Sequence, residues 1–260
     1  MTARALATLL PASLAGYVEN VWLGCPDASA VDVVPVTALA AHRDAMLEAM
    51  ALRYAGDPAL HAGPMLSQWS KYYFRLVVPA ALGAALVLRQ PLAMSAVHSA
   101  VGLRDGMPLA LYLPEDALGA PDEDPAVRYR SLCDDHLPHM IAAVSAMARL
   151  APRVLWSNAG NLLDSLFEQA SLFPDRTGDK TWLFKAGDTF RSGEGNALRC
   201  PVRWVTPRAA CLGTPFRSRR VCCMRYEIPG EETDLCSSCP RLLTMSDAEL
   251  AEQASLPLAT

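Results

Sequence analysis

Four cysteines near the C-terminal end constrain this chain more than any other feature. Cys222 and Cys223 are adjacent, and Cys236 and Cys239 form a Cys-x-x-Cys pair after twelve intervening residues. Four thiols within eighteen residues are too concentrated for ordinary core cysteines. We therefore interpret them as the ligands of one four-thiolate site.

The spacing of these cysteines bears on which metal they bind. Thiolates prefer soft or borderline metals, which leaves zinc or an iron–sulfur cluster. Structural zinc sites usually use two Cys-x-x-Cys-like knuckles. Cys222 and Cys223 would point to opposite faces of an extended segment, so they converge on one ion only if the backbone turns sharply. A two-iron cluster is a larger target, so the spacing favours it modestly and leaves zinc open.

Composition places the chain among packed globular proteins. Its 260 residues are 52% hydrophobic and 19% charged, and the formal net charge is -4. Without a long basic run, this charge argues against nucleic acid as a partner. The N-terminal segment lacks the charged start and cleavage site of a signal peptide. The other cysteines are scattered rather than arranged as a disulfide framework, so we expect a reducing, cytoplasmic environment; they are Cys25, Cys133, Cys200 and Cys211.

Apolar periodicity and turn residues predict a mainly helical chain with some strands. The most apolar segment, residues 64–92, predicts a buried, kinked core helix, because its uninterrupted apolar run is too short to span a membrane. Other helices are expected at 36–55, 126–150 and 154–173. A β-hairpin is expected at 97–113 around an Asp-Gly turn. Two further strands are expected at 198–205 and 216–228, and a capping box at Ser246 opens a short terminal helix.

Three groups of residues outside the cysteine motif allow more than one interpretation. An aromatic and basic cluster at 69–75 is typical of core aromatics with snorkelling cations, and less so of a ligand-binding face. Ser157 and Asn158 are good N-cap residues, although a helix N-terminus can also face a ligand's oxygens. His136 and His139 share a helical face, but no third ligand is fixed by the spacing, so we predict no metal site there.

Several segments together resemble one protein family. They are Arg219 to Tyr226 around the first cysteine pair, Leu155-Trp156-Ser157-Asn158 followed by Gly160, and Pro64 to Pro79. The chain resembles the FhuF family of ferric-siderophore reductases over about residues 36–243. The loop between the cysteine pairs is slightly longer than is typical of that family, and the residues after Leu243 form an extension with no assigned role.

The resemblance implies an α+β fold, in which a mostly helical siderophore-binding domain with a β-hairpin covers residues 1–197. A small β-hairpin and loop module at 198–245 would carry a 2Fe-2S cluster on Cys222, Cys223, Cys236 and Cys239, and 246–260 would form a terminal helix or extension. Such a cytoplasmic protein passes one electron to siderophore-bound Fe(III), and the Fe(II) formed is held less tightly by the hard oxygen donors.

The resemblance also implies partners and further site residues. Arg219, Arg220 and Arg225 would tune the cluster or dock an electron donor, such as a ferredoxin or a ferredoxin/flavin reductase; ordinary exposed strand charges explain them equally well. The substrate would be a ferric siderophore, with the hydroxamate type expected. No membrane span is expected, but the protein could dock peripherally on a membrane. We expect the substrate contacts to come from Trp69, Lys71, Tyr72, Arg75, Trp156 and Asn158.

The sequence leaves two functions of other classes open. In the first, the protein is a binding domain, and the four thiolates bind a zinc ion that only holds its C-terminal hairpin together. In the second, an iron–sulfur protein senses iron or redox state and acts through a protein partner. Visible absorption and an EPR signal after reduction would separate the first from a reductase, and ferrous iron release from a ferric siderophore would separate the second.

Overall fold

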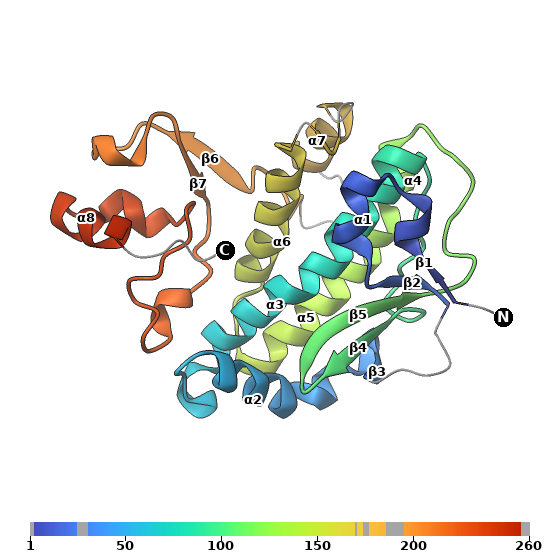
Figure 1. Cartoon of the computed structure of the whole chain (residues 1–260), viewed down its shortest axis with the longest axis horizontal. Helices are drawn as coiled ribbons and strands as arrows, with labels where there is room; N and C mark the ends of the chain where they lie inside the picture. The colour runs from blue at the N-terminus through green and yellow to red at the C-terminus, as the bar shows by residue number, and fades with distance from the viewer. Residues whose placement is uncertain (1–2, 25–30, 170, 174–176, 186–194, 256–260) are drawn as a thin grey trace.

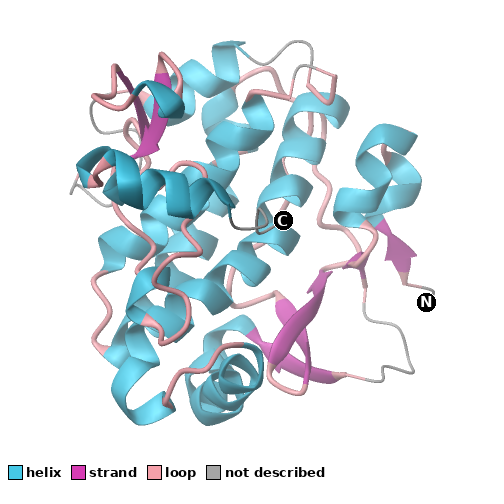
Figure 2. Cartoon of the chain, turned by 60° about the vertical axis from the view of Figure 1, so that its left-hand side comes forward, coloured by secondary structure: helices cyan, strands magenta, loops and turns pink. Residues whose placement is uncertain are grey.

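A computed structural model describes residues 3–24, 31–169, 171–173, 177–185 and 195–255 of the chain. Cys25, one of the scattered cysteines, lies outside these residues. Most of the described chain is helical, and the strands lie in two separate places, a larger sheet and a small hairpin (Figure 2). The predicted α+β class, with a mostly helical body and a small C-terminal hairpin, is confirmed.

One long helix forms the centre of the helical body. Helix α3 (Pro58–Leu82) continues as a π-helical segment, Gly83–Leu88, and packs against α2 (Arg43–Arg53), α5 (Leu137–Ala148) and α6 (Pro152–Phe167) (Figure 1). Asp57 caps its start by accepting a hydrogen bond from the Ala59 amide. The predicted core helix is therefore present, but it begins at Pro58, and its non-helical dihedral angles lie at His61 rather than at Pro79.

The same helix is the only described one that is long and apolar enough to cross a membrane. Its apolar window, however, is 67% buried inside the protein. Trp69, Tyr73, Phe74 and Val77 are all fully enclosed among the other helices and the sheet. This is the burial expected of a core helix in a globular body.

A five-stranded mixed sheet covers one side of this body, with strand order β1-β2-β5-β4-β3. The predicted hairpin is formed by β4 (Ala100–Arg104) and β5 (Met107–Leu113), and its turn residues Asp105 and Gly106 have φ values of 49° and 76°. Two positive φ values are the geometry of a type I′ turn. The sequence did not predict the N-terminal strands β1 (Arg4–Ala5), β2 (Val21–Leu23) and β3 (Asp32–Pro35), which extend the hairpin into a sheet.

Several predicted helices are divided in the structure. The segment predicted as one helix at 36–55 is a 3-10 helix, Val36–His42, followed by α2. The one at 126–150 consists of α4 (Pro125–Arg128), a π-helical turn at Leu132–His136, and α5. Helix α6 begins at Pro152, so Ser157 and Asn158 lie inside it, and their interpretation as N-cap residues was wrong.

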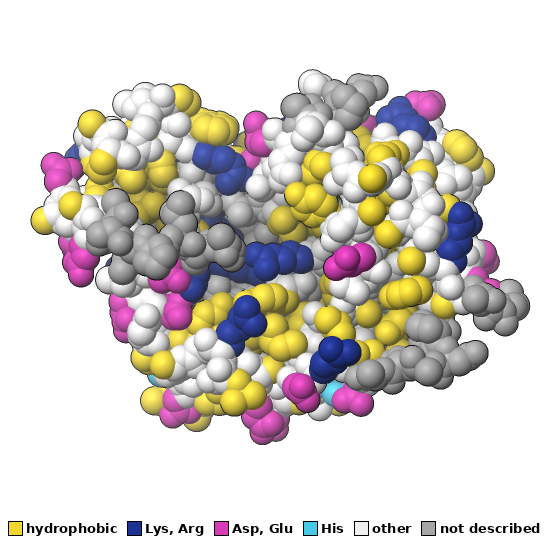
Figure 3. All heavy atoms as spheres, in the orientation of Figure 1, with side chains coloured by type: hydrophobic (Ala, Val, Ile, Leu, Met, Phe, Trp, Pro, Cys, Tyr) yellow, Lys and Arg dark blue, Asp and Glu magenta, His cyan; other side chains and the backbone are white. Residues whose placement is uncertain are grey.

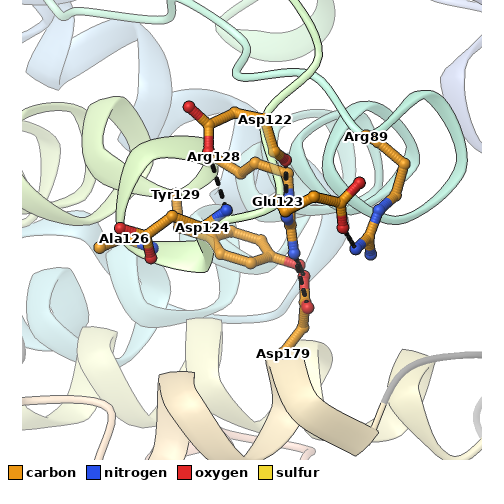
Figure 4. Close-up of polar contacts among 8 residues, drawn as sticks. All are labelled: Arg89, Asp122, Glu123, Asp124, Ala126, Arg128, Tyr129 and Asp179. Atoms are coloured by element: carbon orange, nitrogen blue, oxygen red, sulfur yellow. Dashed lines mark hydrogen bonds and ion pairs between the residues drawn. The ribbon is translucent and has the colours of Figure 1, made fainter.

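A buried ion pair fastens α4 to α7 (Thr177–Phe184), the helix that follows α6 in the chain (Figure 4). Arg128 is 3% exposed and donates to both carboxylate oxygens of Asp179 at 2.7 Å. The Tyr129 hydroxyl donates to the same carboxylate at 2.8 Å. Because the buried charges are paired and hydrogen-bonded, they hold α7 to the body instead of opposing its burial.

The C-terminal part of the chain packs partly on a core of its own. Strands β6 (Val202–Val205) and β7 (Phe216–Arg219) form an antiparallel hairpin, and the capping box at Ser246 and Glu249 opens helix α8 (Asp247–Ser255) as predicted. Strand β7 ends at Arg219, so the expectation that a strand runs into Cys222 and Cys223 was wrong. A small hydrophobic cluster, separate from the main core, is formed by Phe216, Leu235, Cys239, Leu242 and Leu250.

Candidate metal centre

The four cysteines that the sequence singles out lie together in the structure. Cys222 hydrogen-bonds through its side chain with Cys223 and with Cys239, and Cys236 does so with Cys223 and with Cys239. The thiols therefore form a closed ring of four contacts, which we call the thiol ring. All four are free of disulfide bonds.

The two cysteine pairs reach the ring through different backbone turns. Met224 has a left-handed conformation with φ of 63°, so the chain turns directly after Cys223. In the second pair the Cys239 amide donates to the Cys236 carbonyl at 2.9 Å and closes the Cys-x-x-Cys turn. The Arg219 amide donates to the Ser238 carbonyl at 2.9 Å, which holds the end of β7 against that turn.

Side chains of helices α3 and α6 hold the segment that carries the first cysteine pair through hydrogen bonds. Ser67 Oγ and Gln68 Nε2 both donate to the carbonyl oxygen of Cys223, at 2.7 and 2.8 Å. Ser157 Oγ donates to the carbonyl oxygen of Val221 at 3.0 Å. Buried carbonyl groups need such partners, so these three side chains fix the position and direction of the cysteine segment relative to α3 and α6.

A lysine of α3 contacts the thiol ring directly. Lys71 Nζ lies 3.2 Å from Cys223 Sγ and donates to Gln68 Oε1 at 2.6 Å. The hydrogen bonds of Cys223 with Cys222 and Cys236, and the positive charges of Lys71 and Arg219, hold the pKa of the Cys223 thiol well below its ordinary value, although burial opposes this. By contrast, hydrogen bonds with Cys222 and Cys236 raise the pKa of Cys239. The fold therefore favours the thiolate at Cys223.

Asn158 of α6 connects α3 to Arg219, the second basic residue near the thiol ring. Its Nδ2 donates to the Ser67 carbonyl at 2.9 Å and to Ser70 Oγ at 3.0 Å, and its Oδ1 accepts from Arg219 Nη2. Arg219 is only 2% exposed, and its Nε atom has no hydrogen-bond partner among the described residues. A buried guanidinium in such surroundings lacks a counter-charge.

These surroundings fit a thiolate-bound iron–sulfur cluster. Lys71 and Arg219 form no ion pair with a carboxylate in the described part of the chain. A cluster held by four thiolates is an anion, so it would supply the negative charge that both cations lack. Tetrathiolate zinc would be an anion too, so it is the adjacent pair Cys222 and Cys223, rather than the charge, that favours the larger two-iron group.

A cavity of about 530 Å³ opens beside the thiol ring, and we call it the basic cavity. This volume is within the range of small-molecule sites. Figure 3 shows Lys and Arg side chains gathered along the hollow between the C-terminal part and the helical body. The basic cavity is lined by Arg53, Tyr54, Gln68, Lys71, Tyr72, Arg75, Arg225, Glu231, Leu235, Cys236 and Ser237.

The structure separates the six residues expected to contact substrate. Lys71, Tyr72 and Arg75 line the basic cavity. Trp69 is fully buried and donates to the Gly106 carbonyl at 2.8 Å, so it has no surface for a ligand. Asn158 is 4% exposed and is occupied by the contacts described above, and it lines a small cavity of about 140 Å³ together with Lys71 and Arg75. Trp156 lines a different cavity, of about 630 Å³, together with Arg220.

The three arginines near the first cysteine pair are placed differently as well. Arg219 is buried beside Asn158, whereas Arg220 is exposed. Arg225 forms ion pairs with Glu231 at 2.6 Å and with Asp234, so it closes the loop between the cysteine pairs. Sequence reasoning missed Ser67, Gln68 and Ser157 as supports of the site. Polar residues within the most apolar helix were the signal that could have found the first two.

Comparison with known proteins agrees with this site. A mainly helical protein that holds four thiols between α3, α6 and a C-terminal hairpin has the features of an iron–sulfur redox protein. The model of the family "Ferric iron reductase FhuF-like transporter" matches residues 67–210, and that of the "FhuF 2Fe-2S C-terminal domain" matches residues 219–241. The chain belongs to this FhuF-like ferric iron reductase family, and the cofactor of its C-terminal domain is a 2Fe-2S cluster.

One characterised relative can be compared along its length. The "Ferric siderophore reductase" of Escherichia coli (strain K12) is 27% identical to this chain over 183 residues. The similarity covers 68% of this chain and 65% of that protein, so it spans less than two thirds of the relative. The family resemblance expected from the sequence is confirmed.

Proposed function

We propose that this protein is a ferric-siderophore reductase and that the basic cavity holds the ferric complex. The observation that carries the proposal is that Cys236 lines both this cavity and the thiol ring, so that a bound complex would lie against one of the thiols. The name of the Escherichia coli relative supports the same substrate class.

The residues of the thiol ring would hold the cofactor in this proposal. Cys222, Cys223, Cys236 and Cys239 are the ligands. Ser67 and Gln68 orient the first pair through the Cys223 carbonyl, and Ser157 does so through the carbonyl of Val221 before it. When bound, a 2Fe-2S cluster supplies single electrons at a low potential.

The basic residues around the thiol ring and the basic cavity supply positive charge and contact the substrate. Lys71 and the buried Arg219 place positive charge at Cys223, which favours the more negative, reduced state of the site. Lys71, Tyr72 and Arg75 face the ferric complex from α3. Ferrous iron leaves after the electron arrives, because oxygen donors that hold Fe(III) tightly hold Fe(II) much less tightly.

We further propose a cytoplasmic protein that receives its electrons from a ferredoxin or a ferredoxin/flavin reductase. Arg220 is the member of the arginine group with an exposed side chain, so it is the one suited to contact an acidic donor. Peripheral docking at a membrane is compatible with this role. A hydroxamate siderophore remains the expected iron source.

Anaerobic purification after iron-replete expression tests the proposal. The loaded protein should absorb visible light and become EPR-active on dithionite reduction. Addition of a ferric trihydroxamate to the reduced protein should then bleach the reduced signal, and a ferrous chelator should trap one iron per electron. A colourless protein with one bound zinc would contradict the proposal, and a cluster that stays reduced beside the ferric complex would favour a sensor.

A further inference from the structure

The charges in the basic cavity are unbalanced. Four cationic side chains line it, and Glu231 is its one acidic residue within the described chain. Glu231 accepts from Arg225 at 2.6 Å, so this carboxylate is already used. Arg53, Lys71 and Arg75 have no ion-pair partner among the described residues. The charges of Arg53 and Arg75 are therefore left for whatever occupies the cavity, and that of Lys71 is shared between the cavity and the thiol ring.

Two of these charges are held in place by one aromatic ring. The Arg53 guanidinium lies 5.0 Å from the centroid of the Tyr72 ring, and that of Arg75 lies 5.6 Å from it. Cation–π contacts restrict both long side chains, so less order has to be imposed when a ligand binds. Arginine also presents planar N–H groups that match carboxylate and similar oxygen pairs.

The third charge links the cavity to the thiol ring. Lys71 lines the cavity and also contacts Cys223 Sγ at 3.2 Å. The three cations therefore extend from the neighbourhood of the thiols to Tyr72. One electron added to a ferric complex makes the complex more negative by one unit, so the same cations favour both the binding of an anion and the arrival of the electron.

We propose that the basic cavity selects ferric complexes of net negative charge, whatever groups hold the iron. This inference rests on the proposed function, because it assigns the ferric complex to the same cavity. Anionic complexes supply the counter-charge that Arg53 and Arg75 lack, whereas cationic complexes are repelled by these two arginines. The selection is electrostatic, so it weakens as salt screens it.

Matched gallium(III) complexes provide the test, because gallium is not reduced and only binding is measured. One linear trihydroxamate with a terminal amine is used in three forms: the free amine with a positive charge, the N-acetyl form without charge, and the N-succinyl form with a negative charge. Calorimetry with the loaded full-length protein should give affinities that rise in this order. At low salt we expect about 5-fold to 10-fold for each unit of charge.

Two variants check that the arginines cause the order. In Arg53→Gln/Arg75→Gln the succinyl form should bind about 10-fold more weakly or worse, while the neutral form keeps its affinity and so shows that the cavity is intact. The control Arg153→Gln removes an exposed arginine from the other cavity and should leave the order unchanged. Equal affinities for the three forms, or the reverse order, would overturn the charge selection alone. If no form binds, the assignment of the ferric complex to this cavity falls as well.

Discussion

Lys71 offers the sharpest test of how the protein part acts on its redox site. The perturbation is Lys71→Met, which keeps an unbranched side chain of similar length and removes the charge. At the observed 3.2 Å between Nζ and Cys223 Sγ, a unit charge pair interacts by about 5 kcal/mol at an effective dielectric constant of about 20 and by about 1.3 kcal/mol in water. Because Lys71 is half-buried, we take about 1–2 kcal/mol.

This energy acts on the reduction potential with a definite sign. The ammonium stabilises the more negative, reduced state, so its removal should lower the potential. For a one-electron couple, about 1–2 kcal/mol corresponds to about 40–85 mV. The potential is measured on the loaded protein by anaerobic dye-mediated titration, with the EPR signal of the reduced state as the readout.

A matched variant separates this effect from a change in total charge. Lys185 is exposed, so Lys185→Met changes the net charge by the same amount and should move the potential little. The reasoning is refuted if Lys71→Met leaves the potential where it was or raises it. A fall of equal size in both variants would also count against it, because the effect would then not depend on the contact with Cys223.

Three further predictions concern folding. Asn158→Ala removes the acceptor of the buried Arg219, so urea unfolding should show a free energy of unfolding lower by about 3 kcal/mol. A decrease below about 1 kcal/mol would contradict the role of Asn158. Burial lowers the pKa of His136 to about 4, so the neutral ring stabilises the folded state above pH 6.5. The free energy of unfolding should fall as pH falls from 6.5 toward 4, by about 2 kcal/mol at pH 5. This pH dependence should vanish in His136→Gln. Gly106→Ala places a Cβ 2.1 Å from the Ala45 oxygen and should lower the melting temperature strongly, whereas Gly178→Ala, in open space, should not.

The sequence could predict the thiol ring because its information is local. Cys222, Cys223, Cys236 and Cys239 are close along the chain, and thiolate chemistry restricts what they can bind. The hairpin at Asp105 and Gly106 was predictable for a similar reason, since the turn needs positive φ at two consecutive residues. In both cases a few neighbouring residues determine the local structure.

The rest of the site depends on how helices face one another. Trp69 and Lys71 are two residues apart on α3 and point to different sides, one into the core against Gly106 and the other to Cys223. Only the packing of α3 against the sheet and α6 decides which side meets the thiols. Asn158 was misread because its role depends on where α6 begins. Pro152 in the first turn was the local signal for that start.

Short strands were missed for a different reason. β1 and β2 have two and three residues, too few for an alternating pattern to be recognised. Strand β2 forms because the edge of β5 offers backbone partners, and β1 then pairs with β2, which are tertiary effects. The end of β7 at Arg219 is similar, since the hydrogen bonds that follow it go to Ser238 and Pro201 rather than to a continuing strand.

The thiol ring also lies where two separately packed cores meet. Val221, Met224 and Ile228 pack into the large helical core, whereas Cys239 belongs to the small C-terminal core, and Cys222 and Cys236 pack against it. A group bound by all four thiols would therefore join the small core to Cys223, whose carbonyl Ser67 and Gln68 hold on α3. Cofactor insertion would then act as a final assembly step, because a ligand that binds only the folded state stabilises it. Unloaded chains should therefore be cut by proteases in their C-terminal part first.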